Sequence, residues 1–329
     1  MKSLVSRWNH NRDNITDNRT LRVNWHLGNT CTYKCSYCDS KLNAGNIPWV
    51  SINAAKKIVD DIIAVYREKY NKSIFIFELT GGEPTVYPGI EELSQYMKSL
   101  GIYVQLCTNG SRTVRWWEEN AANFTSITNS YQVEFTDVKH LTAVCNTVLD
   151  KGVTSNVLVL LDPLQFNKIK NDIEYMKEFG NFGISVRRVY DRNPAVKRSY
   201  EYTNEQLLYL NNNATIKEKK SVAFPQEMQY QTIMIKDETS LNVNENALFG
   251  TEDNNFLGWD CYAGIDTLSL DVTGNILPAY CYTGYKKVIG SWLTDNLADL
   301  QWPAGKMKCG DMRCVCVHDL RARKNTNAD

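Results

Sequence analysis

Apolar positions between residue 21 and about residue 190 alternate between strand-like and helix-like spacing. Residues 21–27 read as a short apolar strand, and residues 51–70 carry apolar side chains three and four positions apart, with Ser51 as a helix cap. We expect further strands at 74–79, 102–107, near 126, 153–161 and 183–189, and further helices at 90–100, 114–123, 137–151 and 166–179. Six strand–helix repeats with short loops predict an α/β fold with a parallel sheet, curled into a partial (β/α)6 TIM-like barrel.

The rest of the chain lacks this alternation of strand-like and helix-like segments. Residues 1–20 are interpreted as an N-terminal extension, 21–190 as the core barrel, and 191–257 as a linker that contains a hairpin at 230–243. Residues 258–329 are expected to form a small C-terminal domain, rich in cysteine, with a β-hairpin that turns near Thr273 and Gly274.

Charge and composition exclude several classes of function. Lys plus Arg equals Asp plus Glu at 37 each, so the chain gives no strong signal for nucleic acid or an anionic membrane. Residues 1–11 are polar and do not resemble a secretory signal, and no apolar run approaches the 18 or so residues of a membrane span. Ten cysteines, mostly in two groups, indicate metal sites in a reducing compartment, and we expect a cytoplasmic protein.

The first cysteine group follows the first predicted strand and consists of Cys31, Cys35 and Cys38. Three thiolates at this spacing can ligate three irons of one [4Fe–4S] cluster and leave the fourth iron open to a small molecule. A structural zinc site favours four ligands arranged in pairs, and a disulfide framework suits a short secreted chain, so both alternatives fit less well.

Other polar residues follow the later strands, where parallel α/β folds place their chemistry. Gly81-Gly82-Glu83-Pro84 follows the second strand and Thr108-Asn109-Gly110 follows the third. Together with the cysteine motif, and with Tyr37 just before its third cysteine, these turns resemble the radical S-adenosylmethionine (SAM) superfamily over residues 20–190.

The resemblance implies a cofactor set and a reaction. Cys31, Cys35 and Cys38 would hold the [4Fe–4S] cluster, whose open iron would be chelated by SAM. Reductive cleavage of SAM would give a 5′-deoxyadenosyl radical, which abstracts hydrogen from an unactivated C–H bond of the substrate. The family needs no catalytic side chain beyond the cluster and SAM, and it takes its electron from an external donor such as flavodoxin or ferredoxin.

The resemblance also implies a set of SAM-binding residues. Gly81, Gly82, Glu83 and Pro84 resemble the family's site for the methionyl ammonium, although the segment also suits an ordinary turn. Contacts with the remaining parts of SAM are expected from Asn109, Ser130 and Arg187. Arg188 is an alternative to Arg187 as partner of the SAM carboxylate, because only one of two neighbours on a strand is expected to face inward.

The second cysteine group resembles the SPASM or twitch extension of radical SAM enzymes, which carries auxiliary iron–sulfur clusters. Its members are Cys261, Cys281, Cys309, Cys314 and Cys316. Four of these five would ligate one auxiliary [4Fe–4S] cluster, so the shorter twitch type is the closer match. A zinc knot is the structural alternative, and His318 is expected at the surface. Cys107 and Cys145 are expected to be small buried apolar residues.

Relatives with such an extension suggest a peptide or protein as the substrate, with small molecules as further possibilities. Modification of a nucleoside or nucleic acid is a second hypothesis, and activation of a glycyl-radical partner enzyme is a third. A non-catalytic electron carrier would not need the Gly81–Pro84 turn.

Overall fold

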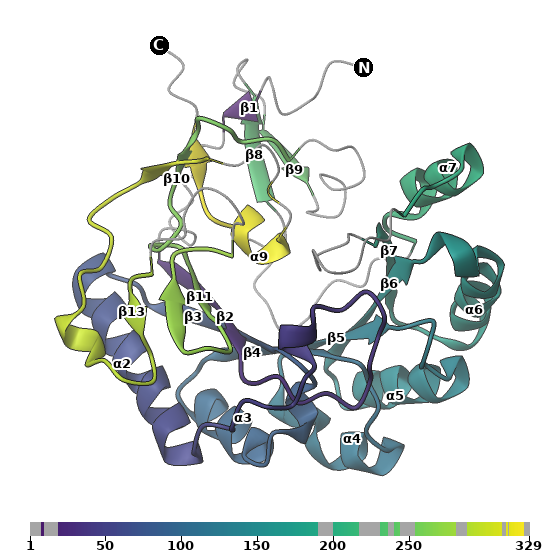
Figure 1. Ribbon diagram of the computed structural model, residues 1–329, viewed down its shortest axis with the longest axis horizontal. Helices are drawn as coiled ribbons and strands as arrows, with labels where there is room; N and C mark the ends of the chain where they lie inside the picture. The colour runs from purple at the N-terminus through teal and green to yellow at the C-terminus, as the bar shows by residue number, and fades with distance from the viewer. Residues whose placement is uncertain are drawn as a thin grey trace.

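The computed structural model describes residues 8–9, 19–189, 200–216, 231–235, 240–243, 254–280, 288–310, 314 and 316–325. Cys281 lies outside the described residues. Most of the described chain forms one curved sheet with helices along its convex face (Figure 1).

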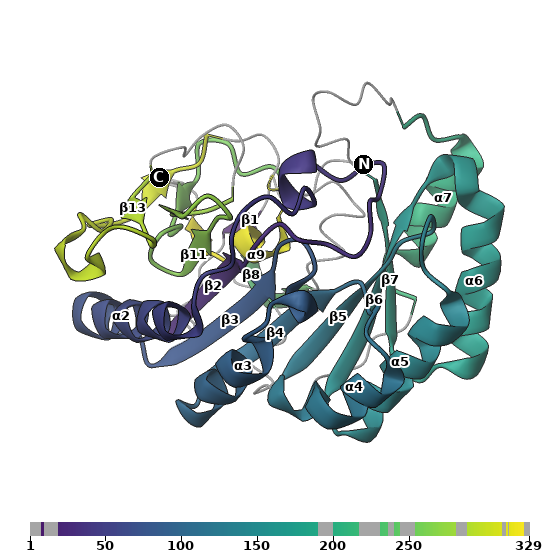
Figure 2. The ribbon, with the colours of Figure 1, turned by 60° about the horizontal axis from the view of Figure 1, so that its bottom comes forward.

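Six consecutive parallel strands form the larger part of this sheet, and the expected partial barrel is confirmed. The strands are β2 (Thr20–His26), β3 (Ile74–Thr80), β4 (Tyr103–Thr108), β5 (Ser126–Tyr131), β6 (Thr154–Leu161) and β7 (Gly183–Arg188). The helices that connect them are α2 (Ile52–Tyr70), α3 (Ile90–Ser99), α4 (Val114–Asn120), α5 (Val138–Asp150) and α6 (Phe166–Phe179). Figure 2 shows these helices on one side of the strands.

The hydrophobic pattern explains why strands and helices pack in this way. On β2, Leu21, Val23 and Trp25 are fully buried in the main core. The intervening side chains of β2 then belong to the concave face, because neighbours on a strand point to opposite sides. Helix α2 contributes a buried stripe to the same core, and the Ser51 hydroxyl caps it by accepting from the Ala54 amide at 3.3 Å.

The C-terminal hairpin extends this sheet beyond β2. Strand β11 (Thr267–Leu270) pairs parallel with β2 and antiparallel with β12 (Asn275–Leu277), which pairs with β13 (Gly290–Ser291). The order is β13-β12-β11-β2-β3-β4-β5-β6-β7, and no closed barrel forms within the described part of the chain. The hairpin predicted near Thr273 and Gly274 is therefore present, and it shares the core of the barrel.

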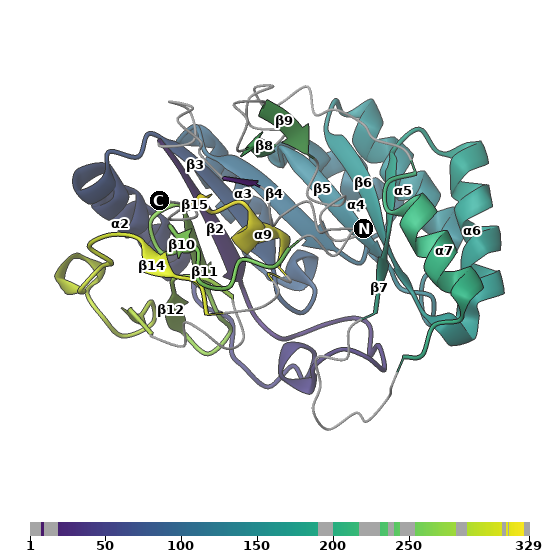
Figure 3. The same ribbon diagram turned by 90° about the horizontal axis from the view of Figure 1, so that it is seen from above.

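Smaller elements lie over the concave side. Strands β8 (Gln231–Ile235) and β9 (Ser240–Val243) form the hairpin predicted at 230–243, and β1 (Trp8–Asn9) pairs with β8. Strand β10 (Asp260–Cys261) lies between β14 (Met307–Lys308) and β15 (Lys324–Asn325), close to helix α9 (Val317–Leu320) (Figure 3).

Helix α7 (Asn204–Asn213) lies in the stretch that was expected to be a linker, and it packs against β7. Its N-terminus carries a capping box in which Thr203 and Gln206 exchange side-chain and backbone hydrogen bonds. The remaining short elements are the 3-10 turns η2 (Ser40–Leu42), η3 (Pro84–Val86), η4 (Ala121–Asn123), η5 (Pro163–Gln165) and η7 (Leu297–Asp299). No described helix has the length and apolar character required to cross a membrane.

A buried ion pair joins the C-terminal region to the barrel. Lys72, just before β3, donates to Asp266 at 2.8 Å, and their side chains are 1% and 6% exposed. Arg323 also donates to Asp266, at 2.6 Å through Nε and 2.9 Å through Nη2. Asp266 therefore fixes the start of β11 against the barrel.

We predict that Asp266→Asn lowers the free energy of unfolding by about 3 kcal/mol, because the buried Lys72 ammonium would then face a neutral amide. The control is Asp61→Asn, which removes an exposed pair with Lys57 and should cost about 0.5 kcal/mol or less. Equilibrium urea unfolding measures both changes. Equal effects of the two substitutions would contradict the role given to Asp266.

Candidate functional site

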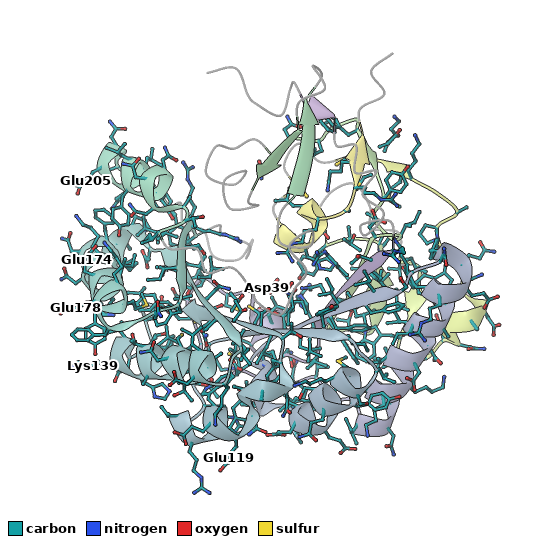
Figure 4. The ribbon with its side chains drawn as sticks, turned by 180° about the vertical axis from the view of Figure 1, so that it is seen from behind. Asp39, Glu119, Lys139, Glu174, Glu178 and Glu205 are labelled. Atoms are coloured by element: carbon teal, nitrogen blue, oxygen red, sulfur yellow. The ribbon has the colours of Figure 1, made fainter. Side chains whose placement is uncertain are left out.

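A cavity of about 380 Å³ opens at the carboxyl edge of the parallel strands. It is lined at one end by the cysteine loop after β2 and at the other by β6, β7 and α7. Asp39 also lines it, and Figure 4 shows Asp39 near the middle of the molecule while labelled side chains such as Glu174 and Glu205 project outward from α6 and α7. The side chains after several different strands thus meet around one space.

The three N-terminal cysteines all line this cavity. Burial, together with repulsion from the neighbouring thiolates, raises the pKa of Cys35 to about 12 and that of Cys38 to about 11. The pKa of Cys31 is also raised, chiefly by burial. Three thiolates this close need a positive group among them, and a purely thiol donor set suits an iron–sulfur cluster.

No three His, Cys, Asp or Glu side chains among the described residues are grouped as ligands of one metal ion. In a [4Fe–4S] cluster each cysteine binds a different iron, so its ligands need not converge on a single point.

The Gly81-Gly82 turn is locked to the loop that carries the cysteines. The amide of Gly82 donates to the Gly28 carbonyl, and the amide of Glu83 donates to the Thr30 carbonyl, each at 2.8 Å. A Cβ on Gly82 would contact the Thr30 carbonyl oxygen and lie 2.7 Å from its carbon. Gly81 has φ +117°, a conformation that favours glycine. Packing against this loop therefore requires both glycines, in addition to any role with a ligand.

Glu83 does not line the cavity but organises its wall from inside the core. Its side chain is 1% exposed and accepts hydrogen bonds from the Thr85 amide (3.0 Å), the Thr85 hydroxyl (2.6 Å), the Thr108 hydroxyl (2.6 Å) and the Asn109 amide (2.7 Å). Burial raises the pKa of Glu83 above its ordinary value, although these hydrogen bonds act in the opposite direction. Pro84 is likewise buried behind the wall and begins the 3-10 turn η3. Glu83 thus joins the turn after β3 to the turn after β4.

Asn109 lines the cavity, but its side chain is engaged with the cysteine loop. Its Nδ2 donates to the Thr32 hydroxyl at 2.9 Å and lies 3.8 Å from the Cys31 sulfur, while its Oδ1 accepts from the Ser111 amide at 3.0 Å. The Cys31 sulfur also accepts from the Tyr33 amide at 3.4 Å. Asn109 is therefore placed to orient Cys31.

Two further contacts fix the cysteine loop. The loop after β5 holds it through Glu134, which accepts from the Ser36 amide at 2.8 Å and from the Ser36 hydroxyl. Asn29, which is 1% exposed, holds residues 39–47: its Nδ2 donates to the Lys41 carbonyl and to Asn46, and its Oδ1 accepts from the Ile47 amide. Leu42 and Asn43 of this segment line the cavity.

The remaining predicted residues lie along the far wall. Ser130 lines the cavity next to Cys107, whose sulfur is 3.7 Å from the Ser130 hydroxyl. The expectation that Cys107 is an ordinary core residue is wrong, because it faces this space, whereas Cys145 is fully buried as expected. Arg187 and Arg188 both line the cavity, although only one was expected to do so. Arg188 is the last residue of β7, where strand alternation ends.

The C-terminal cysteines form a second group. Cys261, Cys309 and Cys314 are each at most 5% exposed and belong to one small buried cluster. Burial raises the pKa of Cys261 to about 11, and the thiols of Cys314 and Cys309 contribute to the rise. The structure therefore brings three of the five predicted ligands together, with Cys316 at the start of α9.

His318 is buried, so its predicted surface position is wrong. It is 4% exposed, and burial, reinforced by the charges of Arg22 and Arg321, lowers its pKa to about 3. The short helix α9 points it into the interior instead of toward solvent.

Several cavity residues were not predicted from sequence. Helix α7 and its C-terminal end contribute Leu210, Asn211 and Ala214, and Tyr280 comes from the C-terminal region. The capping box at Thr203 and Gln206 is a readable helix signal in the linker. Tyr280 has no such signal, since its position depends on the pairing of β11 with β2.

Comparison with known proteins identifies the domain around the cysteine loop. Residues 25–135 match the family model described as the radical SAM superfamily. A curated relative, the S-adenosylmethionine-dependent nucleotide dehydratase of Fibrobacter sp. (strain UWH6), is 29% identical over 96 residues. That match covers 28% of each chain, so the similarity spans under a third of the relative's length.

Solved structures share the fold over most of the chain. The structure described as native anSMEcpe with bound AdoMet has a TM-score of 0.56 and 16% identity, covering 85% of this chain and 80% of that one. Streptococcus suis SuiB bound to its precursor peptide SuiA has a TM-score of 0.57 and 16% identity, covering 85% and 64%. At this identity the likeness concerns the fold.

The contact between Gly82 and Thr30 gives one prediction. Gly82→Ala places a methyl group against the Thr30 backbone, so the loop must move and we expect a loss of about 2 kcal/mol in the free energy of unfolding. The control is Gly305→Ala, since the Cβ position of Gly305 has no atom within 4 Å. Thermal unfolding of the two variants measures the difference, and an unchanged Gly82→Ala protein would contradict the locked turn.

The raised thiol pKa values give a second prediction. In metal-free protein, iodoacetamide should alkylate Cys35 and Cys38 with a rate that still rises about tenfold per pH unit above the ordinary thiol pKa of about 8.5, because the thiolate fraction is still rising. Mass spectrometry of the labelled peptides follows each cysteine. The urea-unfolded chain serves as the control, and a plateau at the same pH in both states would contradict the assignment.

Proposed function

We propose that the chain is a radical SAM enzyme, because residues 25–135 match the radical SAM superfamily model. It would use a [4Fe–4S] cluster and SAM to remove hydrogen from an unactivated C–H bond of its substrate. One observation carries the proposal: three cysteine thiols and the Gly81-Gly82 turn line the same cavity at the carboxyl edge of the sheet. When bound there, cluster and SAM would supply a 5′-deoxyadenosyl radical, which is chemistry that no side chain provides.

Cys31, Cys35 and Cys38 would bind three irons. Their surroundings support this role, since the three half-buried thiols line one cavity and the Cys31 sulfur accepts from the Tyr33 amide and lies 3.8 Å from the Asn109 amide nitrogen. Leu42 and Asn43 of the segment held by Asn29 line the same cavity as the thiols and would limit access of water.

SAM would occupy the space between the cysteine loop and β7. Gly81 and Gly82 would face its methionyl ammonium, Ser130 its ribose or methionine part, and Arg187 its carboxylate. Glu83 and Pro84 would support the Gly81-Gly82 peptides from behind, because both are buried outside the cavity lining. Asn109 would act mainly on the cysteine loop, to which its amide is already hydrogen-bonded.

We further propose one auxiliary [4Fe–4S] cluster at the C-terminal cysteines. Cys261, Cys309 and Cys314 would supply three ligands, and Cys281 or Cys316 the fourth. The burial of three thiols in one small cluster supports a metal site. Zinc in place of iron remains the alternative, and metal analysis of the purified chain distinguishes them.

A peptide or protein is the proposed substrate, with flavodoxin or ferredoxin as the electron donor. Support comes from the structural likeness to SuiB with its bound precursor peptide, which extends over 85% of this chain. A nucleotide is the second candidate, because the Fibrobacter relative is a nucleotide dehydratase. The balanced charge of the chain favours the peptide over a nucleic acid.

The test is anaerobic reconstitution with iron and sulfide, followed by SAM and dithionite. We expect 5′-deoxyadenosine from the wild-type chain and a loss of at least about a hundredfold in Cys38→Ala, since an iron ligand is removed. Cys145→Ala, whose thiol is buried away from the cavity, should keep the activity. Cleavage by Cys38→Ala at the wild-type rate, or no cleavage by a wild-type chain with a reducible cluster, would refute the proposal.

The same assay separates the substrate classes. With a deuterated cell extract, hydrogen abstraction transfers deuterium into 5′-deoxyadenosine, which mass spectrometry detects. A peptide or protein substrate predicts that protease treatment of the extract abolishes the transfer. Transfer that survives protease but is lost after nuclease and phosphatase treatment would instead favour the nucleotide.

A further inference from the structure

Lys324 is a fully buried lysine that faces the C-terminal cysteine group. Its residue is 1% exposed, and it lies on β15, which pairs antiparallel with β10. In this pairing Lys324 is directly opposite Cys261. Directly opposite residues of an antiparallel pair present their side chains on the same face, with Cβ atoms about 4.5–5.5 Å apart. Figure 3 shows the two strands beside α9.

The ammonium of Lys324 is held by dipoles at the end of α9. Its Nζ donates to the carbonyls of Asp319 (2.6 Å), Ala322 (3.0 Å) and Leu320 (3.4 Å), and it lies 5.1 Å from the centroid of the Phe256 ring. These contacts orient the ammonium within the core. Transfer of a cation into a protein core is costly, and a nearby anion offsets the cost most effectively.

The thiols of Cys261, Cys309 and Cys314, which become anionic when they bind metal, share one buried cluster with Phe256, whose ring lies beside the Lys324 ammonium. Backbone bonds fix all three: Cys261 belongs to β10, the Cys309 amide donates to the Trp259 carbonyl at 2.7 Å, and the Cys314 amide donates to the Asn254 carbonyl at 2.9 Å. The Asn254 side chain returns a hydrogen bond to the Cys314 carbonyl at 3.0 Å. The thiols and the lysine thus belong to one rigid arrangement.

We propose that Lys324 is the built-in counter-cation of a metal–thiolate centre at Cys261, Cys309 and Cys314. This inference rests on the auxiliary site proposed above and assigns its charge balance to a residue outside the cysteine motif. When metal binds, each ligating thiol gives up its proton, and the resulting thiolates carry the negative charge that the ammonium offsets. A cation beside an iron–sulfur centre favours its reduced state, which has one more negative charge.

The alternative is that Lys324 only ties the carbonyls at the end of α9 together. Lys324→Gln separates the two roles, because glutamine keeps N–H donors for the carbonyls but has no charge. Lys324→Met removes both the donors and the charge. Lys308→Met is the matched control, since Lys308 lies on β14 at the other side of β10 and its side chain is 58% exposed.

The experiment is made in a Cys38→Ala background, so that the N-terminal cluster contributes no signal. Each anaerobically purified chain is analysed for iron and zinc, and an iron centre is followed by EPR during a redox titration. We expect Lys324→Gln and Lys324→Met to lower the ratio of reduced to oxidised centre at a fixed potential about tenfold, and Lys308→Met to change it little. If the metal is zinc, the expected change is about tenfold faster loss to a chelator.

A Lys324→Gln chain that matches the parent in potential and metal retention, while Lys324→Met loses its metal, would overturn the charge role and leave only the structural one. A parent chain that binds neither iron nor zinc at these cysteines would overturn the auxiliary site as well. The two failures are distinguishable, because the charge role can fail alone only when the parent chain carries metal at these cysteines.

Discussion

The contact between the Gly81-Gly82 turn and the loop at Gly28 and Thr30 is the constraint on which the site depends. Neighbouring parallel strands place these two turns side by side, but only residues without a side chain allow the backbones to approach this closely. Two amide–carbonyl hydrogen bonds of 2.8 Å then fix the start of the cysteine loop. Contacts of Asn109 with Cys31 and Thr32, and of Glu134 with Ser36, hold the rest of that loop.

Glu83 extends this constraint to a third strand. A buried carboxylate that accepts four hydrogen bonds joins the turn after β3 to Thr108 and Asn109 after β4. The side-chain amide of Asn109 in turn contacts the Cys31 sulfur and the Thr32 hydroxyl in the cysteine loop. The cysteine loop, the turn after β3 and the turn after β4 are thus each hydrogen-bonded to the other two. Such a rigid wall suits a site that must hold a reactive species in one position.

Much of this arrangement follows from local sequence patterns. The alternation between strand and helix spacing predicts all six central strands and the helices between them, because each pattern reflects one buried face. The cysteine spacing and the glycine turn likewise identify the end of the cavity that they line. Because the carboxyl ends of neighbouring parallel strands lie at the same edge of a sheet, these turns are expected to lie close together.

What sequence could not provide are the contacts between distant segments. The pairing of β11 with β2 joins residues far apart in the chain, and no local pattern encodes it. The position of Tyr280 and the burial of His318, which lies near Arg22 and Leu268, depend on that docking. The pairing of Lys324 with Cys261 likewise joins segments that are distant in the sequence. That Arg187 and Arg188 both line the cavity was not predicted for a simpler reason: alternation predicts direction only within a strand, and Arg188 is where β7 ends.

The central claim is that the three N-terminal thiols leave one iron open and that SAM binds to it. Pulsed electron–nuclear double resonance of the reduced cluster, with SAM labelled with nitrogen-15 at its amine and oxygen-17 at its carboxylate, measures this directly. The account predicts a hyperfine coupling to both labels. A reduced cluster that shows neither coupling in the presence of saturating SAM would contradict it.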